Sequence, residues 1–96
     1  MVKIHDGFAN ADMALLALSH CLVYFATQDY LIGSYVKRSQ ASFDLSVHYR
    51  GDNVPMIPWG AIQPSSYEIT YYDDADEPFK VMRLFFEVAK PKEGEL

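Results

Sequence analysis

The hydrophobic residues of this chain repeat with two different periods, and the change falls near residue 38. Between residues 10 and 30 they recur at helical spacing, whereas between residues 42 and 49 they alternate strictly with polar residues. A period of 3.6 buries one side of a helix, and a period of 2 buries one face of a strand. The sequence therefore predicts a helix packed on an antiparallel sheet.

The length of 96 residues suits a single domain, which we expect to span residues 1–96 with a frayed, charged tail at 90–96. Half of the residues are hydrophobic, so the chain has enough apolar surface for one modest core. The single cysteine, Cys21, excludes an internal disulfide, and its apolar helical setting predicts an inert thiol. No signal segment is visible, and the apolar run at 13–26 is too short to span a bilayer, so we expect a cytoplasmic location.

Turn signals divide the chain into one helix and several strands in the order β-α-β-β-β-β. The helix is expected from an N-cap at Asn10 to about Thr27. The expected strands are 1–5, 30–36 with a bulge at Gly33, 42–49, 67–72 and 79–89, the last being the longest. Prolines 55 and 58 make 54–62 an edge strand or an irregular segment. The fold class is therefore α+β, with a single helix on a curled sheet of about four or five strands.

The predicted helix is apolar on more than one side. Its polar stripe, formed by Asp12, Ser19, His20 and Thr27, is interrupted by Leu16 and Val23. Two interpretations stay open: the sheet and loops cover these residues, or Leu16 and Val23 mark a contact with a second chain in a homodimer.

The net charge of −5 argues against direct binding to nucleic acid or to an anionic membrane, because both require clustered cations. A protein with a basic surface is the partner that this sign favours. The densest cluster of carboxylates, Asp73, Asp74, Asp76 and Glu77, lies in a predicted hairpin loop. It is interpreted as a solvated tip, a cation site or a contact for a basic partner, and the calcium-loop pattern is missing.

Aromatic residues are numerous, with seven Tyr and six Phe, and one core cannot easily hide them all. Trp59 lies in the proline-bounded segment, where it packs into the core or anchors a partner. With the neighbouring Tyr67, Tyr71 and Tyr72 it forms the set of apolar anchors that we assign to partner binding. The histidines match no zinc pattern, and His20 and His48 are interpreted as solvent-facing.

No nucleophile elbow, phosphate loop or paired cysteine motif is present, so the sequence predicts no enzyme activity, cofactor or metal. The leading hypothesis is a non-enzymatic protein-binding module. Two alternatives are a small-ligand-binding domain or weak enzyme with a pocket between helix and sheet, and a self-associating structural subunit.

The order β-α-β-β-β-β resembles that of cystatin-like folds, in which a sheet grips a helix. The chain lacks the Gln-x-Val-x-Gly loop of cystatins, so the resemblance implies topology and not protease inhibition. In size, acidity and lack of catalytic motifs the chain is similar to immunity proteins and to phage-encoded blockers of host nucleases. That similarity implies a small acidic inhibitor of a basic, nucleic-acid-handling target.

Overall fold

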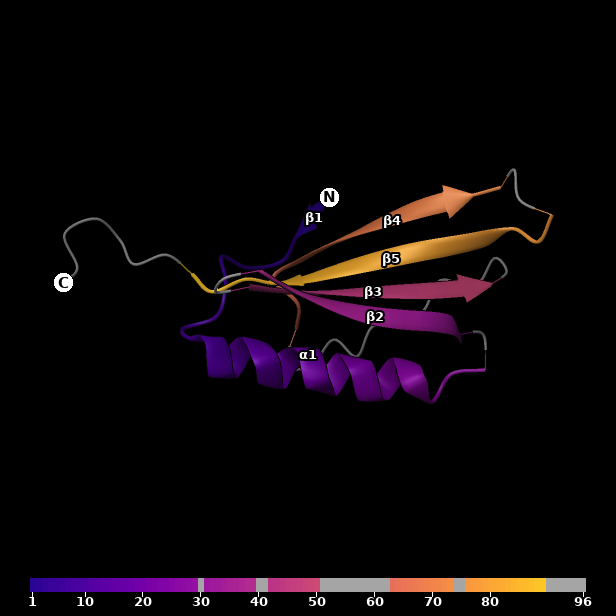
Figure 1. Ribbon diagram of the computed structural model, residues 1–96. Coiled ribbons are helices and arrows are strands. Elements are labelled where there is room, and N and C mark those ends of the chain that lie inside the picture. Colours follow the sequence, from indigo (N-terminus) through magenta and orange to yellow (C-terminus); the bar gives the residue numbers. More distant parts are fainter. Residues whose placement is uncertain (30, 40–41, 51–62, 74–75, 90–96) are drawn as a thin grey trace.

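The computed structural model describes residues 1–29, 31–39, 42–50, 63–73 and 76–89. Within these ranges the chain forms one helix on one side of an antiparallel sheet (Figure 1). In chain order the elements are β1 (Val2–Lys3), α1 (Ala11–Ala26), β2 (Leu31–Ser39), β3 (Ser42–Arg50), β4 (Ser66–Tyr72) and β5 (Phe79–Phe86). The predicted α+β class and the order of its elements are confirmed.

The strands lie side by side in the order β1-β4-β5-β3-β2, so β5, the last strand in the chain, is the central strand of the sheet. Two hairpins, β2–β3 and β4–β5, meet where β3 pairs with β5, with Leu45 opposite Leu84. These two strands carry the most regular alternation of apolar residues, and central strands bury the most surface. The two-residue β1 and the mostly exposed β2 form the edges.

The core lies between α1 and the central strands. The helix buries a stripe at spacings of three and four residues, and the strands bury every second residue, which is the pattern expected for each geometry. Each fully buried Leu or Phe removes apolar surface worth about 1.5–3 kcal/mol from water. The core residues are Ala14, Ala17, Leu18, Cys21, Phe25, Phe43, Leu45, Val47, Tyr49, Met82, Leu84 and Phe86.

The ends and faces of α1 follow its sequence. The Asn10 side chain accepts a hydrogen bond of 2.9 Å from the backbone N–H of Met13, which confirms the predicted N-cap. The predicted polar stripe faces solvent. Leu16 and Val23 are 52% and 66% exposed, so the described part of the chain does not bury them.

Gly7 joins the start of the chain to the segment after β5. Its φ is +133°, and a Cβ there would lie 2.7 Å from the Ala89 nitrogen and 2.8 Å from the Glu87 carbonyl oxygen. Hydrogen bonds from Phe8 N–H to Glu87, 2.7 Å, and from Ala89 N–H to the Phe8 carbonyl, 2.8 Å, hold this contact. Glycine is required here both by its conformation and by the lack of space.

Several predicted boundaries are wrong. The last strand ends at Phe86 and not at residue 89, because Val88 leaves the ladder and forms a parallel bridge with Phe8. At nine residues each, β2 and β3 are longer than β5. The strand expected over 30–36 extends to Ser39, because the polar residues 37–39 pair with the start of β3. The predicted bulge at Gly33 is confirmed by a register shift. The predicted segment 54–62 and the tail 90–96 lie outside the described residues.

Candidate functional site

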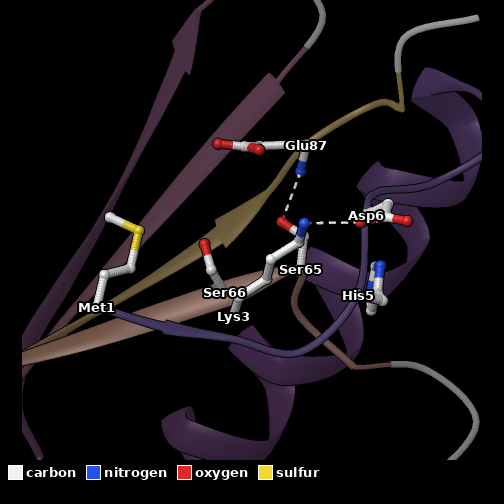
Figure 2. Close-up of a pocket in the computed structure, with 7 residues that line it drawn as sticks. All are labelled: Met1, Lys3, His5, Asp6, Ser65, Ser66 and Glu87. Carbon is white, nitrogen blue, oxygen red and sulfur yellow. Dashed lines mark hydrogen bonds and ion pairs between the residues drawn. The ribbon is translucent and has the colours of Figure 1, made fainter.

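A cavity of about 260 Å³ lies beside β1, lined by Met1, Lys3, His5, Asp6, Ser65, Ser66 and Glu87 (Figure 2). Its one ion pair joins Lys3 and Asp6 at 2.7 Å, among the lining residues. The hydrogen bond to Lys3 lowers the pKa of Asp6, and the same bond raises the pKa of Lys3. Both side chains are largely exposed, so this pair adds little to stability.

The His5 and Ser65 side chains in this cavity form hydrogen bonds with backbone groups. The Gly7 N–H donates to His5 Nδ1 at 3.1 Å, so Nε2 carries the ring hydrogen and donates to the Gln63 carbonyl at 3.0 Å. The Ser65 hydroxyl donates to the Phe85 carbonyl at 2.7 Å. It accepts from the Glu87 N–H at 3.1 Å (Figure 2). A base and a nucleophile need a free nitrogen and a free hydroxyl, so these bonds give both groups a structural role.

The face of the sheet turned away from α1 is the larger candidate surface. Paired residues in an antiparallel ladder point to the same side, so the register assigns each side chain to a face. Among the described elements, no helix or strand packs on this side (Figure 1). We call it the open face; the side chains that the register places on it are those of Lys3, Tyr35, Lys37, Ser39, Ser42, Asp44, Ser46, His48, Arg50, Ser66, Glu68, Thr70, Tyr72, Phe79, Val81, Arg83 and Phe85.

Four rings form a row across the open face, from β4 through β5 and β3 to β2. Tyr72 stacks on Phe79 at 4.7 Å and 8°, and Phe79 is parallel to His48 at 6.2 Å and 6°. His48 then contacts Tyr35 at 6.1 Å and 60°. We call these four residues the aromatic row. Tyr72 and Tyr35, at its two ends, are 40% and 57% exposed.

The register of the strands produces this row. Tyr72 lies directly opposite Phe79, whereas Phe79 and His48, like His48 and Tyr35, are diagonal neighbours on adjacent strands. Aromatic side chains reach across both spacings. His48 lies on the side of β3 away from α1, as the sequence predicts, and its ring is half-buried between its neighbours.

The acidic loop begins at the β4–β5 end of the aromatic row. Asp73 follows Tyr72 directly, and Asp76 and Glu77 precede Phe79 by two or three residues. All three carboxylates are exposed, and we call them the acidic tip. Asp74 lies outside the described residues. The structure thus brings carboxylates and stacked rings together at one end of the open face.

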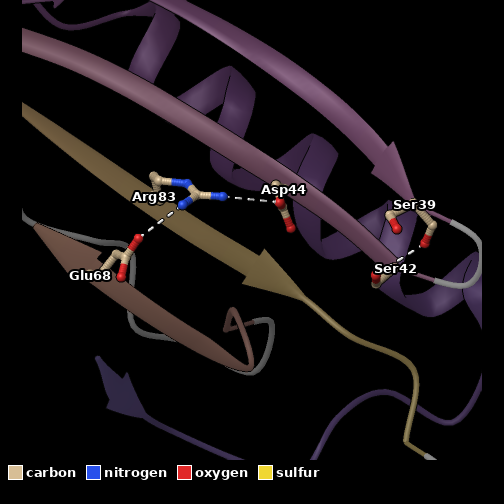
Figure 3. A network of polar contacts seen from close by, with 5 residues as sticks. All are labelled: Ser39, Ser42, Asp44, Glu68 and Arg83. Carbon is tan, nitrogen blue, oxygen red and sulfur yellow. Dashed lines mark hydrogen bonds and ion pairs between the residues drawn. The ribbon is translucent and has the colours of Figure 1, made fainter.

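Arg83 crosses the open face beside the row. Its guanidinium donates to Glu68 at 3.1 Å and to Asp44 at 3.4 Å, joining β4, β5 and β3 (Figure 3). The same group lies 5.0 Å from the Phe85 ring. Two carboxylates for one guanidinium leave this network with excess negative charge, as at the acidic tip.

The other predicted anchors lie elsewhere. Tyr67 and Tyr71 point to the helix side, opposite to Tyr72. Tyr67 is half-buried against the core, whereas Tyr71 is 56% exposed with the Lys80 ammonium 5.5 Å from its ring. Trp59 lies outside the described residues. Leu16 and Val23 lie on α1 and take no part in the open face.

Sequence reasoning missed three members of the aromatic row: Tyr35, His48 and Phe79. Alternation assigns each ring to a face of its own strand, but the row depends on which strands are neighbours. The pairing of β3 with β5 makes Phe79 and His48 neighbours, and no sequence motif in either strand predicts this pairing.

Burial raises the pKa of the Cys21 thiol to about 11, so the predicted inert thiol is neutral at physiological pH.

No group of three or more His, Cys, Asp or Glu residues in the described ranges is arranged to hold a metal ion. Over the same ranges, no helix is long and apolar enough to cross a membrane.

Comparison with known proteins gives no relative: no family model, no curated protein and no solved structure matches this chain.

Proposed function

We propose that this protein is a non-enzymatic binding module that uses the open face to contact a protein with a basic surface. The observation that carries the proposal is the aromatic row ending at the acidic tip. The rings at both ends of the row are exposed to solvent and already contact their neighbours, so they offer contact area with little ordering cost.

Cationic side chains fit this surface better than anionic ones. Lysine and arginine bind to the faces of aromatic rings, and an arginine also stacks flat on them. The carboxylates of the acidic tip lie within a residue or a few residues of Tyr72 and Phe79, so one basic segment would meet both features. The net charge of −5 adds long-range attraction to such a partner.

Occlusion is the mechanism that follows from these contacts. A protein that handles nucleic acid presents a groove of Lys and Arg to the phosphate backbone. A folded acidic surface seated in that groove would exclude the nucleic acid without any chemical step. The module would thus act as a small inhibitor or antagonist.

The double variant Asp73→Lys/Asp76→Lys tests the proposal. Capture of basic proteins from the lysate of the native host should fall sharply, and the affinity for a captured target, measured by calorimetry, should lose most of its salt dependence. The matched control is Asp12→Lys/Asp29→Lys, which changes the net charge equally at exposed sites outside the open face. Equal loss of binding in both variants would show that overall charge, and not the acidic tip, attracts the partner.

A second variant tests the rings. Tyr72→Ala removes one end of the aromatic row, whereas Tyr71→Ala removes an exposed ring from the opposite face. Binding should weaken roughly tenfold or more in the first variant, as expected for an aromatic anchor, and should hardly change in the second. Equal binding by both variants would remove the open face from the proposal.

A further inference from the structure

The strand β4 has a neighbour on only one side along most of its length. In the described part of the chain, β1 pairs with Ser66 and Tyr67 alone, whereas β5 pairs with every residue of β4. The stretch Glu68–Tyr72 therefore has an open edge (Figure 1). Alternate residues of an antiparallel strand direct their N–H and C=O groups away from its partner, so this edge presents backbone donors and acceptors to a further strand.

The side chains of this stretch differ between the two sides of the sheet. Glu68, Thr70 and Tyr72 lie on the open face, whereas Ile69 and Tyr71 lie on the helix side. The helix-side pair keeps apolar surface accessible, since Tyr71 is 56% exposed and Ile69 is half-buried. A strand added to this edge would place alternate side chains on the same two sides.

The sign of the charge along this edge favours a basic occupant. Glu68 lies near its start, and Asp73 of the acidic tip follows its end directly. Arg83, the cation bound to Glu68, also binds a second carboxylate. Lys3 is paired with Asp6. A second copy of this chain would bring the same carboxylates and a net charge of −5 to the edge, and like charges side by side destabilise a strand pair.

Tyr72 supplies a separate reason for a cation at this edge. Phe79 stacks on one face of its ring at 4.7 Å, and Phe79 belongs to β5, which lies on the other side of β4 from the open edge. The second face of the ring is therefore turned toward the edge, and Tyr72 is 40% exposed. A guanidinium or an ammonium group binds to such a face.

We propose that a strand of the basic partner adds to β4 along Glu68–Tyr72, and that this strand alternates basic and apolar residues. The basic residue opposite Tyr72 stacks on its ring, and the one opposite Thr70 reaches Glu68 diagonally. The apolar residue between them lies on the helix side, beside Tyr71. The inference rests on the proposed function and adds the conformation and the sequence pattern that the surface recognises.

A synthetic peptide with this pattern is the probe. A labelled, end-capped peptide Thr-Val-Arg-Val-Arg-Val-Thr should bind the full chain at low salt, as measured by fluorescence anisotropy. One control peptide has glutamate in place of each arginine, and the other is N-methylated at its central Arg-Val-Arg. Both should bind roughly tenfold more weakly or worse, because the first lacks the cations and the second lacks backbone donors on both of its edges.

Variants of the chain locate the bound peptide. Tyr72→Ala should weaken binding roughly tenfold or more. Tyr35→Ala, at the other end of the aromatic row, should leave binding unchanged because Tyr35 lies on β2. Thermal unfolding checks that both variants are folded. In hydrogen exchange, the amides of Glu68–Tyr72 should gain protection when the peptide is added, whereas those of β2 should not.

Three results would overturn the inference. One is an N-methylated peptide that binds as tightly as the unmodified one, because side chains alone would then make the contact. Another is protection of β2 in place of β4, and the third is no binding by the arginine peptide. Each of these results leaves the proposed function standing, because the Asp73→Lys/Asp76→Lys variant tests that function separately with basic proteins of the host.

Discussion

The two faces of this sheet are built from the same alternating strands but by different physical means. On the helix side, Leu45, Val47 and Leu84 are fully buried under α1. On the open side, rings stack on rings and a guanidinium binds two carboxylates, with each side chain sheltering its neighbour. The helix covers one face, whereas on the other face, within the described part of the chain, neighbouring side chains partly cover one another.

This contrast separates the face that stabilises the fold from the face that we propose for recognition. Removing aliphatic side chains from water supplies most of the free energy of folding, so the helix side should govern unfolding. Partly exposed rings and paired charges contribute less to folding but remain available to a partner. Substitutions on the two faces should therefore have effects of different size and kind.

The largest effect is expected on the helix side. Leu84→Ala leaves a cavity in the centre of the core and should lower the free energy of unfolding by about 2–5 kcal/mol. Val81→Ala, on the same strand but on the open face, should cost clearly less because Val81 is only half-buried. Chemical denaturation measures both, and equal losses would mean that the open face is covered as well as the core.

The next largest difference in stability is expected between substitutions of two glycines, Gly7 beside the segment after β5 and Gly33 in the edge strand β2. Gly7→Ala forces a positive φ on alanine and a clash with Glu87 and Ala89, which should cost about 1–3 kcal/mol or more. At Gly33 an added Cβ meets nothing within 4 Å, so Gly33→Ala should cost less than about 1 kcal/mol. Thermal unfolding compares the two variants, and a tolerated Gly7→Ala would show that the contact at Ala89 yields easily.

A smaller change in stability is expected in the aromatic row. Phe79→Leu keeps most of the apolar volume but removes the stacking on Tyr72 and His48, which should cost about 0.5–1.5 kcal/mol. Partner affinity should fall by more than this loss of stability accounts for. Calorimetric titration beside chemical denaturation makes the comparison, and parallel losses would give the row a structural role only.

Arg83 tests the charged part of the open face. Arg83→Gln removes two partly exposed ion pairs, and the free energy of unfolding should fall by less than about 1 kcal/mol. The loss should shrink further at high salt, because screening weakens partly exposed pairs. A large loss that persists in salt would indicate a buried network instead.

The smallest expected effect on stability at neutral pH comes from the ionisation of the Cys21 thiol. Its pKa of about 11 in the folded state lies above the ordinary thiol value, so the folded state keeps the proton where the unfolded state loses it. Stability from this group is therefore complete below the unfolded pKa and is lost as pH rises toward 11. Comparing denaturation of the wild type and Cys21→Ala across alkaline pH isolates this effect. Thiol reagents should react with native Cys21 only at the rate of unfolding.

The elements themselves could be read from the chain. The helical stripe of Ala14, Leu18 and Cys21 and the alternation from Phe43 to Tyr49 are local patterns, and each imposes its own geometry. Asn10 and Gly33 likewise act through their immediate backbone, which is why the predicted cap and bulge are confirmed. The predicted ends of the strands are less accurate. Ser39 pairs with Ser42, and Val88 leaves the ladder of β5 to bridge Phe8, so both ends depend on residues outside the strand itself.

Local sequence determined which residues are helical, which are extended and which side of each element is apolar, because propensity and period act over a few residues. The tertiary structure alone decided that β5 lies between β3 and β4. That neighbourhood places Phe79 beside His48 and Arg83 between Glu68 and Asp44, since side chains on different strands meet only after the ladder has formed. The candidate surface is therefore a product of strand order, which long-range burial selects and no short motif encodes.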